Sequence, residues 1–123
     1  MDVGLIDAFD TSGQPNTGHA LETTVYNELS RRGADVAYVK TAEGFEVDFL
    51  ARHPDGRQEL IQVCADASEP ATWNRETRAL DAAHVEHPRA ERIVVVLDAV
   101  AARSLSHPKT RVVPAHQWLL SPE

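Results

Sequence analysis

Three polar residues lie inside otherwise apolar stretches, where carboxylate and amide groups could act together on a metal ion and a phosphate ester. Asp48 and Gln62 lie in the middle of two successive predicted strands, each with apolar neighbours on both sides, and Glu22 lies beside the apolar stripe of a predicted helix. Burying such groups costs free energy unless they find a partner. An oxygen-rich pocket suits Mg²⁺, which polarises a phosphoryl group and generates a hydroxide nucleophile. Glu22, Asp48 and Gln62 are therefore the candidate catalytic and metal-binding residues.

Each of these residues also has a purely structural interpretation. Glu22 could face solvent at the edge of its helix, and Asp48 could be a half-exposed strand residue. Gln62 could satisfy a backbone group at the edge of the sheet. The six histidines are dispersed, and none shows the H-x-x-x-H or Cys/His spacing of a transition-metal site.

The first element that positions these residues is a helix beginning near residue 17. Leu21, Val25 and Leu29 recur every four residues, which indicates one buried helix face. Asn16 or Thr17 can cap its start. The pattern predicts that the helix ends at residues 31–32, where the following glycine allows a left-handed stop.

Three strands come next and predict an antiparallel meander. The alternation in the second strand places Phe45, Val47 and Phe49 on one face and Glu46, Asp48 and Leu50 on the other. An Asp-Gly pair at residues 55–56 is a strong hairpin signal between the second and third strands. The predicted strands are residues 35–41, 44–52 and 57–65.

The second half of the chain predicts another helix and a buried strand. Ser68 is a candidate cap, Pro70 fits the first turn, and the helix should run to residue 84 or 87 with Trp73 and Leu80 on its buried side. Residues 93–97 form a continuous apolar run that favours a strand covered on both faces. The remaining predictions are a weak helix at 100–105, a short strand at 111–113 and a closing turn at 116–120.

These elements predict an α/β fold with one mixed sheet flanked by helices, in the order helix, three strands, helix, strand. The predicted sheet is the three-strand meander plus one further strand. The length of 123 residues fits one domain. We expect an N-terminal extension at 1–16, a core at 17–97 and a C-terminal tail at 98–123.

Composition narrows the classes of function. Nineteen acids against twelve bases give a net charge of −7, which disfavours autonomous binding to nucleic acid because phosphate recognition calls for a basic face. No apolar run approaches the roughly 20 residues needed to span a bilayer, so no membrane role is expected. The N-terminus has no signal-peptide pattern, and the expected location is the cytoplasm. The single cysteine, Cys64, has apolar neighbours typical of a buried, inert thiol.

Taken together, these motifs resemble the PD-(D/E)XK nuclease superfamily, whose core is restriction endonuclease-like. More narrowly, the chain is similar to the C-terminal domain of unknown function of prokaryotic AAA-type ATPases. The resemblance spans nearly the whole chain, and the order and spacing of its motifs are more specific than any single motif. Its recognisable pieces are residues 18–22 (GHALE), 44–49 (GFEVDF), 61–63 (IQV), 111–115 (RVVPA) and 118–120 (WLL).

The resemblance implies roles for individual residues. Glu22 matches the helix glutamate that helps bind metal, Asp48 the central aspartate and Gln62 the first residue of the (D/E/Q)-X-K element. Cys64 falls where the lysine should be, and a thiol cannot supply its positive charge. Loss of such a charge stabiliser costs on the order of a hundredfold in rate. Lys40, on a neighbouring strand, is the candidate replacement.

Three hypotheses follow. The first is a degenerate nuclease-like domain that retains the fold and residual magnesium binding, and that serves as an accessory or interaction domain, for example of an ATPase. The second is an active Mg²⁺-dependent nuclease acting on DNA or RNA with a relocated lysine. The third is an assembly module, such as a homodimer, in which the polar cluster is structural. Cys64 and the acidic charge favour the first and third.

Overall fold

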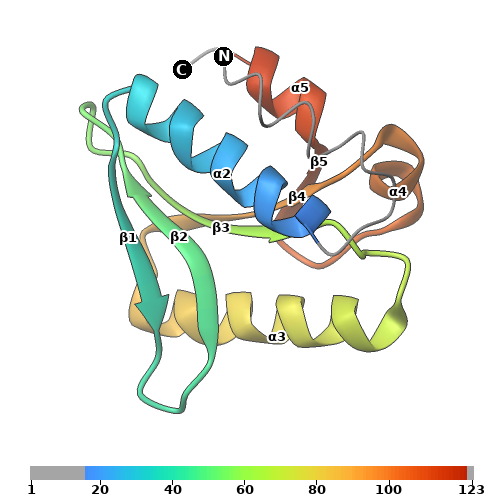
Figure 1. Ribbon diagram of the computed structural model, residues 1–123. Helices are drawn as coiled ribbons and strands as arrows, with labels where there is room; N and C mark the ends of the chain where they lie inside the picture. Colours follow the sequence, from blue (N-terminus) through green and yellow to red (C-terminus); the bar gives the residue numbers. More distant parts are fainter. Residues whose placement is uncertain (1–15, 122–123) are drawn as a thin grey trace.

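A computed structural model describes residues 16–121 (Figure 1). The predicted N-terminal extension lies outside these residues except for Asn16, and the side chains of the cap candidates Asn16 and Thr17 are likewise outside the description. In chain order the elements are α2 (Asn16–Arg31), β1 (Asp35–Lys40), β2 (Glu46–Arg52), β3 (Gln58–Cys64), α3 (Pro70–Glu86), β4 (Ala90–Val96), α4 (Ala99–Ser104), β5 (Thr110–Pro114) and α5 (Ala115–Leu120).

One mixed sheet in the order β1-β2-β3-β4-β5 forms the centre of this α/β fold. Strands β1, β2 and β3 pair antiparallel, as the meander prediction expects, whereas β4 is parallel to β3 and β5 is parallel to β4. The prediction of four strands is wrong, because residues 110–114 join the sheet through backbone pairing with β4. The element order likewise continues past the predicted last strand with α4, β5 and α5.

Two apolar clusters lie on opposite faces of the sheet. Trp73 and Leu80 of α3 belong to one cluster, together with Val94 and Val96 of β4. Leu21, Val25 and Leu29 of α2 belong to the other, with Ile93 and Val95 of β4 and Trp118 of α5. Figure 1 shows α2 and α5 on one side of the strands and α3 on the other. The adjacent residues of β4 thus face alternate layers, which confirms that this strand is covered on both sides.

Several boundaries follow from local chemistry. Gly33 adopts a φ of 79° just after α2, and the backbone N–H of Ala34 bonds to Leu29 O at 3.0 Å, so the predicted glycine stop is confirmed. The prediction of Ser68 as a cap is wrong. Pro70 occupies the first turn of α3, and the residue at the cap position is Glu69, which makes no side-chain cap bond. The predicted closing turn is the short helix α5.

Strand β2 contains a bulge that the alternation did not predict. Ala37 pairs with Leu50 and Val39 pairs with Val47, so two residues of β2, Asp48 and Phe49, lie opposite one residue of β1. Val47 and Leu50 both pack in the α3-side cluster, and Phe49 packs in the other. The predicted alternation is therefore wrong from Phe49 onward. The bulge lets Leu50 become buried while Asp48 sits at the kink.

Candidate functional site

The two candidate strand residues meet where β2 and β3 separate. The antiparallel ladder between these strands runs from the pair Arg52–Gln58 to the pair Phe49–Ile61 and stops there. The next residues of each strand are Asp48 and Gln62. The bulge thus places both candidate side chains at the point where regular backbone pairing ends.

Asp48 and Gln62 replace the missing ladder bonds with side-chain bonds. The backbone N–H of Val63 donates to Asp48 Oδ2 at 2.8 Å, and the backbone N–H of Asp48 donates to Gln62 Oε1 at 3.0 Å. Gln62 Nε2 donates to the backbone carbonyls of Glu46 and Glu76, both at 3.2 Å. Each side chain therefore satisfies backbone groups of the neighbouring strand, and Gln62 also ties the sheet to α3.

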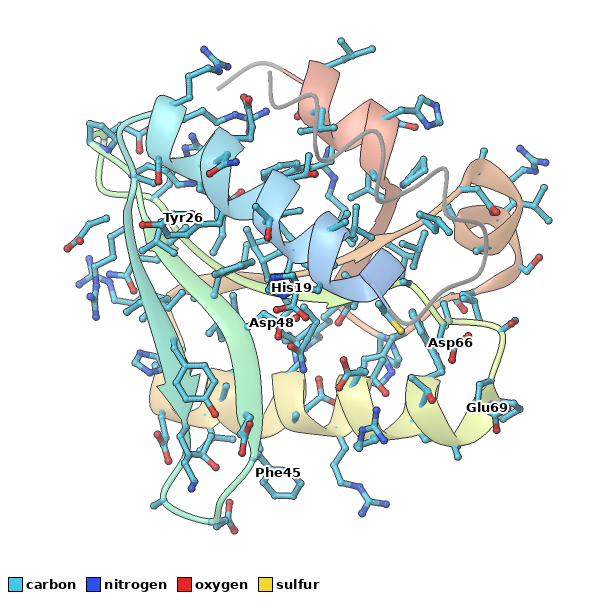
Figure 2. All side chains as sticks on the ribbon, in the orientation of Figure 1. His19, Tyr26, Phe45, Asp48, Asp66 and Glu69 are labelled. Carbon is cyan, nitrogen blue, oxygen red and sulfur yellow. The ribbon has the colours of Figure 1, made fainter. Side chains whose placement is uncertain are left out.

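Asp48 lies in a strongly negative environment. Burial, opposed by the hydrogen bond from Val63 and reinforced by the charges of Glu22, Glu76 and Glu46, raises its pKa to about 7. These neighbours come from α2, α3 and β2 respectively. In the view of Figure 2, Asp48 lies between α2 above and α3 below. The charge of Glu22 therefore acts on Asp48, while a shared metal site of these residues stays a prediction.

Glu76 is a member of this cluster that the sequence reasoning missed. Burial raises the pKa of its carboxyl group, and the charge of Glu22 adds to that rise, while neighbouring Arg75 opposes it at an N–O distance of 3.8 Å. A signal was available in the sequence. Glu76 follows Trp73 by three residues and precedes Leu80 by four, and both of those residues are buried on α3. Its position therefore lies along the buried stripe of the helix.

The donor set at this point is smaller than the prediction of a magnesium site requires. Gln62 is 1 % exposed and its oxygen already accepts the Asp48 N–H, and one Asp48 oxygen accepts the Val63 N–H. Within residues 18–121, no three His, Cys, Asp or Glu side chains form a group that could hold a metal ion. The magnesium site formed by Glu22, Asp48 and Gln62 stays a prediction, with Asp48 and Glu22 as its best-placed oxygen donors.

Cys64 ends β3 inside the α3-side cluster and is 2 % exposed. Burial, assisted by the charge of Glu76, raises the pKa of its thiol to about 11. The thiol is therefore neutral at physiological pH, which agrees with the interpretation of an inert, buried cysteine. A neutral thiol at this position supplies no positive charge to a reacting phosphate.

Lys40 is exposed at the end of β1 and lies across the strand pair from Glu46. Opposite the bulge at Asp48, the residue of β1 is Tyr38 rather than Lys40. Interaction with the Glu46 carboxylate, followed by desolvation and the charge of Asp48, raises the pKa of the Tyr38 phenol. The proposed relocation of the catalytic lysine to Lys40 stays a prediction.

Other polar contacts serve the framework. His53 Nε2 and Glu59 Oε1 lie 2.6 Å apart and both side chains are buried near the β2–β3 turn. Asp81 of α3 bridges Arg92 of β4 at 2.9 Å and His107 at 2.7 Å. The Asp81 contacts connect α3 to later parts of the chain, whereas His53 and Glu59 lie six residues apart around one turn. The spacing of the histidines predicted none of these contacts.

A pocket of about 430 Å³ lies away from the acidic cluster, beyond the carboxyl ends of β3 and β4. Its walls include Ala65, Ala67, Leu97, Val100 and Leu105. This edge is where open α/β sheets commonly bind ligands. Its lining is mostly aliphatic, however, and it contains none of the candidate residues.

Among the described residues, no helix combines the length and the apolar character needed to cross a membrane. Comparison of the chain with protein-family models, with curated proteins and with solved structures finds no match.

Proposed function

We propose that this chain is a nuclease-like domain of the PD-(D/E)XK type that does not hydrolyse phosphodiesters and that acts as an accessory or interaction domain, for example beside an ATPase. The observation that carries the proposal is the state of Cys64. It stands two residues after Gln62, where the resemblance calls for a lysine, and it is buried and neutral. Without a cation there, the developing charge of a phosphoryl transition state has no stabiliser from this position.

The arrangement of elements supports the nuclease-like part of the proposal. Helix α2 precedes the antiparallel strands β1, β2 and β3, and α3 then connects β3 to the parallel strand β4. This is the order that the resemblance implies, with Asp48 and Gln62 on adjacent strands. Strand β5 and helix α5 extend it. Folds of this kind occur in proteins with many different activities, so the function depends on the side chains at the site.

The bonding of Gln62 supports the non-hydrolytic part. In the expected mechanism its oxygen would face a metal ion, whereas here it holds the backbone of β2. Asp48 is similarly engaged with β3, and its pKa of about 7 leaves it partly protonated near neutral pH. A protonated carboxyl group is a poor ligand for a hard cation because metal and proton compete for it.

The experiment measures cleavage of single- and double-stranded DNA and RNA with Mg²⁺ or Mn²⁺, comparing the wild type with Asp48→Asn. The proposal expects equal background in both. Metal-dependent cleavage by the wild type that Asp48→Asn abolishes would overturn it and favour the active nuclease that uses Lys40.

A second variant tests the interpretation of Cys64. If the site is a nuclease centre that lacks only its lysine, Cys64→Lys should create metal-dependent cleavage, with Cys64→Ser as the control. Circular dichroism must show that both variants fold, because Cys64 lies in the core. If Cys64→Lys folds but does not cleave nucleic acid, the polar cluster of Glu22, Asp48 and Gln62 is purely structural.

Residual binding of a divalent cation is part of the proposal. Asp48 and Glu22 would supply oxygen ligands, and a bound cation would favour the ionised form of Asp48, whose pKa is raised by burial first and by neighbouring carboxylates second. Added Mg²⁺ should therefore raise the melting temperature of the wild type at pH 8 more than that of Asp48→Asn. An equal shift in both proteins would remove the metal from the proposal.

A further inference from the structure

Two exposed tyrosines mark a part of the sheet that no helix within residues 16–121 covers. Tyr38 of β1 is 60 % exposed and Tyr26 of α2 is 48 % exposed, although large aromatic side chains usually contribute to a core. The ring of Tyr26 lies 6.2 Å from that of Phe49, the second residue of the bulge. Figure 1 shows the ends of β1 and β2 nearest their connecting turn extending past α2. The rings thus line an open face beside the bulge.

Tyr38 points to the same side of the sheet as α2. Val39, its neighbour along β1, packs in the cluster on the α3 side, and successive strand residues point to opposite faces. The carboxylates of Glu46 and Asp48 raise the pKa of the Tyr38 phenol, and Glu22 of α2 adds to the effect of burial in raising the pKa of Asp48. The exposed aromatic rings and the carboxylates therefore belong to one surface.

We call this surface the acidic tyrosine face and define it by Tyr26, Tyr38, Phe49, Glu22, Glu46 and Asp48. Burial, with a smaller contribution from the neighbouring carboxylates, raises the pKa of Asp48. Lys40 lies across from Glu46 at the end of β1 and borders this face with a positive charge. The net charge of −7 extends the negative field beyond the face itself.

The edge of the sheet adjoins this face. Strand β1 is the first strand in the sheet order, and within the described part of the chain β2 is its one pairing partner. An edge strand presents backbone donors and acceptors to an added strand. Exposed Ala37 and Tyr38 stand in the middle of β1, and no proline there prevents pairing.

We propose that the acidic tyrosine face binds an extended segment of a partner protein that carries arginine or lysine residues, laid along the free edge of β1. The chemistry fits such a segment at each point. A guanidinium group stacks on a tyrosine ring and forms paired hydrogen bonds with a carboxylate. The partner's cations also relieve the repulsion among Glu22, Glu46 and Asp48. A second copy of this chain and a nucleic acid are both disfavoured as occupants, because each would bring more negative charge to a negative surface.

This inference rests on the proposed function, since it assigns the partner chemistry of an interaction domain. The probe is a short peptide alternating arginine and threonine, with acetylated and amidated ends, titrated into the full chain by calorimetry. The matched probe has glutamate in place of each arginine. We expect the arginine peptide to bind, the glutamate peptide not to bind, and affinity to fall as salt rises.

Variants on the face then locate the site. Tyr38→Ala should weaken binding roughly 3- to 30-fold, the range expected for loss of a cation–π contact. Glu46→Gln should weaken it by roughly threefold. Matched controls are Val85→Ala, an exposed apolar residue on α3, and Glu91→Gln, an exposed acid at the start of β4, and both should bind like the wild type.

Besides a failure of the arginine peptide to bind, four outcomes would overturn the inference. The two peptides could bind equally well, or Tyr38→Ala could bind like Val85→Ala. Sedimentation could show self-association that Tyr38→Ala abolishes, which would make a second copy the occupant. Single-stranded DNA could displace the peptide from the same face. The cleavage assay separates this test from the test of the proposed function. If the protein binds the peptide and also cleaves nucleic acid, only the proposed function is contradicted. If the protein neither cleaves nucleic acid nor binds the peptide, only this inference is contradicted.

Discussion

At the scale of single residues, Asp48 has two roles that oppose each other. Its carboxylate satisfies the Val63 N–H where the ladder ends, which favours the charged form, whereas burial and three neighbouring carboxylates disfavour that form more strongly. Perturbed carboxyl groups of this kind gather at functional sites, although structural networks produce them as well. The balance between the two effects can be measured.

Replacement of Asp48 by asparagine should remove much of the pH dependence of stability. The pKa of Asp48 rises from 3.8 to about 7 on folding, so the folded state holds the proton more tightly than the unfolded state does. Ionisation therefore costs stability, which should be highest below about pH 4 and should fall as pH rises toward 7. An asparagine keeps an acceptor for Val63 and carries no charge. Asp48→Asn should exceed the wild type by on the order of 2 kcal/mol at pH 8 and by little at pH 4.

Urea unfolding at both pH values measures that difference, with Glu91→Gln as an exposed control. If Asp48→Asn tracks the wild type at every pH, or loses stability at pH 8, then the hydrogen bond from Val63 outweighs the repulsion.

At the scale of elements, one arginine links the last helix to the first described one, beside their shared apolar packing. Arg32 follows α2 and is buried, and its guanidinium donates to the backbone carbonyls of Trp118 at 3.0 Å and Ser121 at 3.1 Å. It also bonds Glu28 at 2.7 Å and lies 4.6 Å from the centre of the Trp118 ring. Carbonyl groups at the end of a helix lack internal partners, so Arg32 caps α5 from outside.

Arg32→Met should destabilise the chain by about 2–4 kcal/mol, because it removes the charge-assisted hydrogen bonds to the Trp118 and Ser121 carbonyls and the guanidinium stacked on Trp118. The matched control is Arg31→Met, since Arg31 also pairs with Glu28 but is exposed. Hydrogen exchange should quicken in α5 and not in α3. Uniform quickening across both helices would show that α5 has no separate dependence on Arg32.

The sequence predicted most elements because apolar periodicity and turn chemistry are local signals. The helix stop at Gly33 and the Asp-Gly hairpin are examples. The bulge at Asp48 and Phe49 could not be predicted from the sequence, because the extra residue is apparent only when β2 is paired with β1. In the candidate site, Asp48 and Gln62 stood out as polar residues within apolar strands. Their hydrogen bonds to backbone groups could not be predicted from the sequence, because these bonds depend on where the pairing between β2 and β3 ends.

At the scale of the whole molecule, the sheet separates two cores that share their strands. Neighbouring residues of β3 and β4 alternate between the α3-side cluster and the cluster under α2 and α5. Loss of either layer exposes one face of the same strands to water, and that apolar exposure is unfavourable. The two layers should therefore unfold together rather than in sequence.

The chain's two tryptophans allow this to be tested, because Trp73 lies in one cluster and Trp118 in the other. The variants Trp73→Phe and Trp118→Phe each leave one reporter, in the layer opposite the substitution. In each variant, the fluorescence transition in urea should coincide with that seen by far-ultraviolet circular dichroism, as two-state unfolding requires. Both midpoints should fall below that of the wild type, because each change leaves a smaller ring in a filled core. If Trp118 reports an earlier transition than the circular dichroism of the same protein, the layer under α2 and α5 opens first. The chain would then unfold through an intermediate that retains α3 on the sheet.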